Sequence, residues 1–221
     1  MRGIEPINES QPGTLMSWRR KPVWLLKPRN LDICDIALAL SKECRYNGRC
    51  RGFYSVGEHA CHCFDVGRVL NVGPRGLRKL LLHDAPEAFL RDMISPAKLL
   101  LPDYKRLELG VQHAIYNHFR CGLVTPGAFD MVHFVDLIVL KAEQCVARND
   151  MSTWNLGTIP TATIKIGRWC PRRTRKEFLR RYRMTCPPGP INYLYPERPP
   201  AEPRPWSWKD APDPTEQISF L

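Results

Sequence analysis

The sequence lacks the apolar run of about 20 residues that a membrane-spanning helix requires. Its N-terminal stretch also lacks the apolar core of a signal peptide. It contains no internal repeat and no glycine-rich phosphate loop, the feature that ATP-coupled and dinucleotide-binding enzymes use. We therefore expect a soluble, cytoplasmic protein with no membrane partner.

Strand-like alternation is scarce as well, since only segment 161–166 alternates apolar and polar residues convincingly. Helical periodicity is widespread instead. The predicted fold class is therefore all-α, a helical bundle. Helices are expected over six segments: 33–44, 56–66, 77–84, 103–119, 128–147 and 171–183.

Capping residues indicate where the first two helices begin. Asn30 or Asp32 can cap the first helix. Ser55, followed three residues later by Glu58, forms a capping box for the second helix. This start places His59 in the first or second turn of that helix.

Acidic residues are few, 22 against 33 Lys and Arg, which gives a net charge of +11. The excess is concentrated in segment 165–183, which has nine basic residues and one acidic residue, Glu177. Such a segment attracts phosphates of a nucleic acid or of a small nucleotide. A solvated helix face is the alternative interpretation.

The nine cysteines are odd in number and scattered, which argues against a disulfide framework. Most are expected to be reduced core residues. Cys61, His62 and Cys63 follow His59 closely, but no second Cys pair has the spacing of a structural zinc site. We therefore expect no structural zinc.

Composition divides the chain into three parts. Residues 1–22 are polar and are expected to form a flexible arm. Residues 23–186 form the predicted catalytic domain. Residues 187–221 contain ten prolines and few aliphatic residues, so this part is predicted to be an irregular tail that cannot bury a core.

Four polar residues lie next to apolar runs, where an uncompensated polar side chain is unfavourable. His83 and Asp84 follow three leucines, at a helix end that Pro86 should kink or terminate because proline has no backbone N–H. Asp136 lies among valines and isoleucines, where an unpaired carboxylate is costly to bury. Together with His59, these residues are the imidazole and carboxylate donors that a hydrolytic metal site takes from separate helices. A buried salt bridge is the alternative.

The order of these residues resembles the HD-domain phosphohydrolase superfamily, which is named for its adjacent His and Asp metal ligands. The chain is most similar to small bacterial and phage enzymes that act on deoxynucleotides, over residues 24–183. The similarity is carried by five motifs: residues 44–46, 54–59, 83–88, 92–98, and Asp136 to Glu143.

The resemblance implies a role for each matched residue. His59, His83, Asp84 and Asp136 match the metal ligands, which would hold a divalent ion of cobalt, manganese, zinc, nickel, iron or magnesium. The other five matched positions have roles in chemistry and in substrate binding. These are Glu87 as general acid or base, Asp92 as a residue that places water or metal, Arg45 and Lys98 as phosphate-binding groups, and Tyr46 as the ring against the sugar.

The resemblance further implies a metal-dependent phosphohydrolase that uses metal-activated water to attack the α-phosphorus of a deoxynucleotide. A phage-type dNTP (dATP) triphosphohydrolase is the preferred prediction, in the host cytoplasm if the chain is phage-encoded. A 5'-deoxynucleotidase acting on dNMPs is the alternative. A homo-oligomer is expected. A nucleic-acid-binding protein that uses segment 165–183 is the alternative from another class, but a nucleic acid is not the expected partner.

Overall fold

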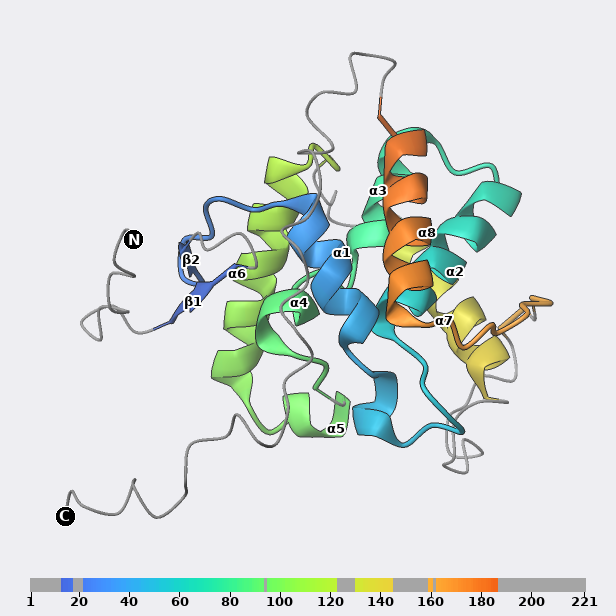
Figure 1. Ribbon diagram of the computed structural model, residues 1–221, viewed down its shortest axis with the longest axis horizontal. Helices are drawn as coiled ribbons and strands as arrows, with labels where there is room; N and C mark the ends of the chain where they lie inside the picture. Colours follow the sequence, from blue (N-terminus) through green and yellow to red (C-terminus); the bar gives the residue numbers. More distant parts are fainter. Residues whose placement is uncertain are drawn as a thin grey trace, which may run out of the picture. The chain divides into compact units, whose positions relative to one another are not determined.

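A computed structural model describes residues 13–17, 22–93, 95–122, 130–144, 159–160 and 162–186. The described part is mostly helical, as predicted (Figure 1). The predicted tail, 187–221, lies outside it. The helices are α1 (Ile33–Lys42), η1 (Arg45–Gly48), α2 (Val56–Val69), α3 (Pro74–Leu82), α4 (Glu87–Leu90), α5 (Ser95–Lys98), α6 (Pro102–His118), α7 (Met131–Glu143) and α8 (Pro171–Met184).

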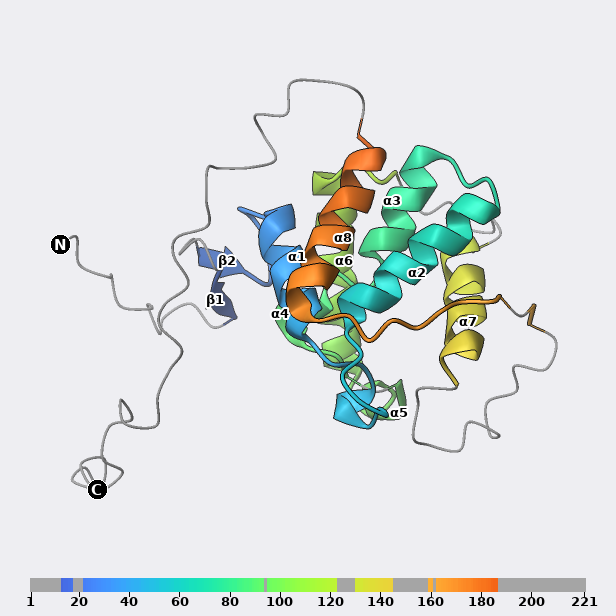
Figure 2. The ribbon, with the colours of Figure 1, turned by 45° about the vertical axis from the view of Figure 1, so that its right-hand side comes forward.

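Helix α2 is the centre of the helical packing. It contacts α1, α3, α7 and α8, and α8 also runs alongside α1 (Figures 1 and 2). The buried interior includes Ile36 and Leu40 from α1, Phe64 from α2 and Phe178 from α8. Gly67 permits the close approach of α2 and α3, because a Cβ atom there would collide with Leu80. These contacts hold two of the metal-competent segments, α2 and the end of α3, against each other.

The predicted start of α2 is confirmed, but its capping box is only half formed. The Ser55 hydroxyl accepts the Glu58 N–H at 3.1 Å. The Glu58 carboxylate does not bond back to Ser55. It accepts the N–H groups of Gly167 and Trp169 at 2.7 and 2.6 Å, so it joins α2 to the segment that leads into α8.

The third helix ends two residues earlier than predicted, at Leu82. Residues 83–86 form a turn in which the Ala85 N–H bonds to the Leu82 carbonyl at 3.1 Å. Pro86 is the N-cap of the short α4, a position where the missing N–H of proline costs no helical hydrogen bond. His83 and Asp84 therefore lie in a turn.

The remaining long helices agree closely with the prediction. Helices α1, α6 and α8 occupy the predicted segments within two residues at each end. Asp32 caps α1, because its carboxylate accepts the Cys34 N–H at 2.7 Å. Helix α7 occupies the middle of segment 128–147, whose ends lie outside the described residues.

The strands differ from the prediction. Strands β1 (Thr14–Met16) and β2 (Pro22–Trp24) pair antiparallel with Leu15 opposite Val23, so the predicted arm 1–22 contains a hairpin strand. Residues 162–166 form no strand. The strand prediction was wrong over these residues because alternation alone supplies no neighbouring backbone to pair with, and Thr161 lies outside the described part. No helix in the described part has both the length and the apolar composition to cross a membrane.

Candidate metal centre

His59 and Cys63 lie one turn apart on α2, and both side chains are completely buried. Their spacing of four residues puts both on one face of the helix. His59 Nε2 lies 3.4 Å from Cys63 Sγ. The face of α2 that carries these two side chains therefore forms one wall of the site.

His83 and Asp84 reach the site from the turn after α3. His83 Nδ1 lies 2.8 Å from the carbonyl oxygen of Leu80. A carbonyl accepts but cannot donate, so Nδ1 carries a proton and Nε2 is the ring nitrogen that can bind a metal. The hydrogen bond thus fixes both the tautomer and the direction of the ring.

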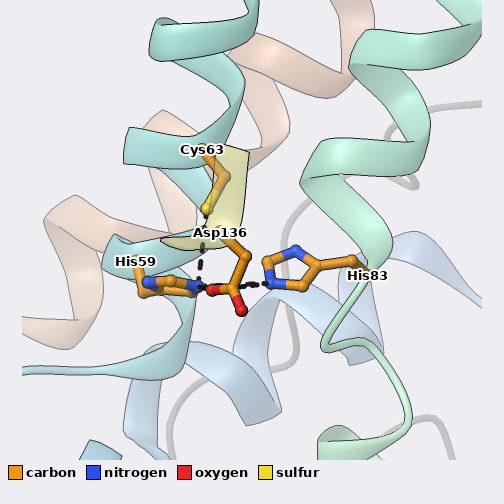
Figure 3. Close-up of side chains that lie close together, drawn as sticks. All are labelled: His59, Cys63, His83 and Asp136. Atoms are coloured by element: carbon orange, nitrogen blue, oxygen red, sulfur yellow. Dashed lines mark hydrogen bonds and ion pairs between the residues drawn. The ribbon is translucent and has the colours of Figure 1, made fainter. Parts of the chain in front are cut away.

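The donor atoms of the four predicted metal ligands meet at one place. His59 Nε2 lies 3.2 Å from His83 Nε2, 3.1 Å from Asp136 Oδ1 and 3.6 Å from Asp84 Oδ2. His83 Nε2 lies 3.3 Å from Asp84 Oδ2 and 3.8 Å from Asp136 Oδ1. Figure 3 shows His59, His83 and Asp136 pointing toward one another. Residues from α2, the turn after α3, and α7 therefore form one cluster.

The spacing of these atoms fits a shared ion. Nitrogen and oxygen donors bound at 2.0–2.2 Å to one metal lie about 2.9–3.6 Å from each other at ordinary bond angles. Four of the five distances fall in this interval, and the fifth, 3.8 Å, is slightly longer. The residues present therefore fit a divalent metal ion.

The electrostatics of the cluster keep its carboxylates ionised. Burial disfavours the charge of Asp84 and Asp136, but hydrogen bonds and charge interactions with His59 and His83 outweigh burial and lower the pKa of both carboxyl groups. Burial lowers the pKa of His83, yet the negative groups around it, Asp84 first, raise it overall. Both carboxylates therefore stay ionised, the form in which a carboxylate binds a metal.

Cys63 is a fifth member of the cluster that the sequence led us to treat as a core residue. The donor atoms of His59, Cys63, His83 and Asp136 all lie within 4.8 Å of one another. Cys63 also packs with Leu80, Val135 and Val139 in an apolar cluster, so the expectation of burial is confirmed. Its spacing of four residues from His59 is the signal that could have placed it in the site.

Glu143 ends the last motif of the resemblance but was assigned no role, and it is completely buried beside the cluster. Its Oε1 lies 2.6 Å from His59 Nδ1 and accepts the Tyr54 hydroxyl at 2.5 Å. Its Oε2 accepts the Tyr46 hydroxyl at 2.6 Å. Burial opposes its charge, but Arg45 and these hydrogen bonds lower the pKa of Glu143 to about 2. Glu143 lies seven residues after Asp136, and this helical spacing was the available signal.

Arg45 lies between the metal-competent cluster and Glu143. One guanidinium nitrogen is 3.2 Å from Asp84 Oδ2, and another is 3.3 Å from Glu143 Oε2. Its buried Nε has no hydrogen-bond partner among the described residues. The guanidinium is therefore held in place by two carboxylates and still has a donor to offer.

Tyr46 adopts a left-handed backbone conformation, with φ of 58°, that is unusual for a tyrosine. Its N–H donates to Asp92 Oδ2 at 3.1 Å, while its hydroxyl binds Glu143. Asp92 therefore holds Tyr46 in its position. The role predicted for Asp92 in placing water or metal stays a prediction.

Glu87 and Lys98 form the remaining pair of predicted site residues. Lys98 Nζ lies 3.7 Å from Glu87 Oε1 and 2.6 Å from Glu108 Oε1. Glu87 is buried, and its Oε2 has no hydrogen-bond partner among the residues that the structure describes. Burial first, and then the charges of Asp84 and Asp92, raise the pKa of Glu87 well above its usual value. Its carboxyl group therefore keeps its proton to higher pH than an exposed glutamate does.

The basic segment 165–183 divides into a structural part and an exposed part. Arg181 is buried and pairs with Asp65 and Glu177, so it stabilises the fold. A Cβ atom at Gly52 would lie 3.5 Å from Arg168, which brings loop 49–53 beside the basic segment. We define the basic surface by its exposed residues: Arg49, Arg51, Phe53, Lys165, Arg168, Arg172, Arg173 and Lys176.

No protein-family model matches the chain. The chain is 38% identical over 126 residues to the uncharacterized protein YfdR of Escherichia coli, a match that covers 57% of this chain and 66% of YfdR. It is 34% identical over 117 residues to an uncharacterized protein of Rhodobacter capsulatus, covering 51% of this chain and 60% of that protein. The matches thus span slightly less than two thirds of each relative.

Proposed function

We propose that this protein is an HD-domain phosphohydrolase that removes phosphate groups from deoxynucleotides with the help of a divalent metal ion. The observation that carries the proposal is the meeting of His59, His83, Asp84 and Asp136 at donor spacings of 3.1–3.8 Å. The same residues carry the resemblance in the sequence. The approach of the two Nε2 atoms to 3.2 Å, with both Nδ1 atoms bonded elsewhere, suits two imidazoles that share one ion.

His59, His83, Asp84 and Asp136 would hold the metal. A bound ion lowers the pKa of its water and polarises the phosphate oxygens. The protein contributes the direction of the ligands: Leu80 fixes the ring of His83, and Glu143 fixes the ring of His59. Such outer contacts orient ligands and raise their basicity.

Arg45 and Glu87 would act on the substrate. Arg45 neutralises phosphate charge, for which a guanidinium suits planar, bidentate contacts. Glu87 holds a proton at its buried carboxyl and passes it to the 5'-oxygen as the bond from that oxygen to the α-phosphorus breaks. Its raised pKa supports the acid role over the base role.

Tyr46 would lie against the sugar. Two hydrogen bonds fix the position of its ring: the backbone N–H donates to Asp92, and the hydroxyl donates to Glu143. A fixed ring can reject a ribose 2'-hydroxyl, because it cannot move aside. The proposal therefore predicts faster turnover of dATP than of ATP.

A triphosphate is the proposed substrate, and a monophosphate is the alternative. The chain has a net charge of +11, and Lys98 adds a cation beside Glu87. These charges favour the more anionic ligand. The two substrates give different phosphorus products: tripolyphosphate from a dNTP and orthophosphate from a dNMP.

The test is to incubate the protein with Mn²⁺ or Co²⁺ and each dNMP and dNTP, and to identify the product by ³¹P NMR. We expect tripolyphosphate from dATP. The variants His83→Ala and Asp136→Ala should lose turnover while remaining folded by circular dichroism. Full turnover in both variants would show that this cluster is not the catalytic centre.

A second candidate function, nucleic-acid binding, is favoured by the basic surface. Segments 47–57 and 162–176 contain no acidic residue, so the surface attracts phosphates without internal neutralisation. The test is fluorescence anisotropy with single-stranded DNA at several salt concentrations. Salt-dependent binding that survives Asp84→Ala, without turnover of any nucleotide, would favour this function over hydrolysis.

A further inference from the structure

Cys63 lies against the metal centre in a way that the other buried cysteine of α2 does not. Its Sγ is 3.4 Å from His59 Nε2, and Figure 3 shows it directed at the same atom that faces Asp136. Cys61 is equally buried, only two residues away. The charged groups that act on Cys61 include Arg181, Asp65 and Glu177, and none of these belongs to the metal centre.

The distance from Cys63 to His59 suits two donors of one ion. With metal–nitrogen bonds of about 2.0–2.1 Å and a metal–sulfur bond of about 2.3 Å, the nitrogen and sulfur atoms lie about 3.1–3.6 Å apart. The observed 3.4 Å falls within this interval.

The apolar contacts of Cys63 are compatible with a ligand role. Leu80, Val135 and Val139 surround one side of the residue. These neighbours come from the helices that deliver the other donors, since Leu80 precedes His83 on the chain and Val135 precedes Asp136. The packing that buries Cys63 therefore also sets its position relative to the donors.

We infer that Cys63 is an additional ligand of the metal ion. This inference rests on the metal site of the proposed function. The thiol loses its proton to the solvent when the ion binds, and the thiolate joins two imidazoles and the carboxylates. Thiolates select softer ions, whereas carboxylate and carbonyl oxygens suit magnesium and manganese. The protein thus binds Zn²⁺ or Co²⁺ in preference to Mn²⁺ or Mg²⁺.

The test uses the full chain, freed of metal with a chelator and then titrated with Co²⁺. A thiolate bound to Co²⁺ gives a near-ultraviolet charge-transfer absorption, and visible d–d bands report binding by any ligand set. We expect both in the unmodified protein. Cys63→Ala should keep the visible bands and lose the charge-transfer band, whereas the matched control Cys61→Ala should keep both.

Competition between Zn²⁺ and Mn²⁺ gives a second measurement. Cys63→Ala should lower the preference for Zn²⁺ at least about tenfold, the size of effect that even the loss of an outer contact produces. Cys63→Val, which refills the apolar space, should behave like Cys63→Ala and serves if the alanine variant fails to fold.

Three outcomes overturn the inference, and they separate it from the proposed function. Visible bands without a charge-transfer band in the unmodified protein mean that a metal binds without Cys63, so only this inference fails. A charge-transfer band that persists in Cys63→Val means that another cysteine is the ligand. No Co²⁺ binding by the folded protein removes the metal centre and the proposed function together.

Discussion

His59 Nδ1 lies 2.6 Å from Oε1 of Glu143, and both side chains are completely inaccessible to solvent. A carboxylate at this distance accepts a hydrogen bond from Nδ1–H, so Nε2 is the nitrogen of His59 that can bind a metal. The two residues are 84 positions apart in the chain. The contact therefore requires α2 and α7 to be packed together.

Replacing Glu143 should weaken the metal centre without removing any ligand. We expect Glu143→Gln to reduce metal affinity by about 10–100-fold, because the amide no longer fixes the His59 tautomer as a carboxylate does. Isothermal titration with Co²⁺ measures the effect. Glu108→Gln is a suitable control, since Glu108 pairs with Lys98. Equal losses in both variants would contradict a specific role for Glu143.

Metal binding should stabilise the folded protein. At a free Co²⁺ concentration of about 100 times the dissociation constant, linkage predicts about 2.7 kcal/mol of added stability. Urea denaturation with and without the metal measures this difference. His83→Ala should show little or no stabilisation, and a gain as large as that of the unmodified protein would place the ion elsewhere.

The activity should depend on the protonation of Glu87. Because burial and neighbouring carboxylates raise its pKa, the protonated acid persists to higher pH than in an exposed glutamate. Turnover should then fall as the pH rises through the raised pKa, since the proton donor is lost. Glu87→Gln should lower kcat by about 10²–10⁴-fold and abolish this decline.

The pH profile of kcat, measured at saturating substrate, tests this assignment. The Co²⁺ affinity of Glu87→Gln, measured by titration, should match that of the unmodified protein. Glu108→Gln keeps Glu87 and should keep the decline at high pH. An unchanged profile in Glu87→Gln would rule out Glu87 as the acid.

Arg78 should matter for stability and not for the metal centre. It is buried on α3, and it donates to the Phe119 carbonyl at 2.7 Å and to the Thr185 hydroxyl at 3.0 Å. Arg78→Met leaves these buried acceptors without their donor, so we expect a loss of about 2–4 kcal/mol in the free energy of unfolding. Chemical denaturation measures it, and Arg75→Met, at an exposed position of the same helix, is the control. Co²⁺ affinity should be unchanged.

The long helices were predictable because each carries a signal within its own segment. Apolar periodicity marks the buried face, and Asp32 and Ser55 mark two starts. The four-residue helices η1, α4 and α5 were not predicted, since one turn is too short to show a period. The β1–β2 hairpin was missed because pairing depends on two segments at once.

The candidate ligands were predictable from residue type and apolar context, as with Asp136 among valines and isoleucines. Cys63 and Glu143 were not, because their side chains are also ordinary in a helix of mixed composition. Whether these side chains face the site depends on how α2 and α7 are rotated about their own axes, and tertiary packing sets that rotation. Spacing from His59 or Asp136 suggests such positions but does not select them.

The bonds from the Glu58 carboxylate to the backbone of Gly167 and Trp169 limit how far the chain can be shortened. Glu58 precedes His59 directly and is completely buried. A chain cut before residue 167 would remove both backbone donors of this carboxylate, one residue from a metal donor. The smallest fragment that keeps these bonds therefore extends through residue 169, although residues 167–169 supply none of the donors in the cluster.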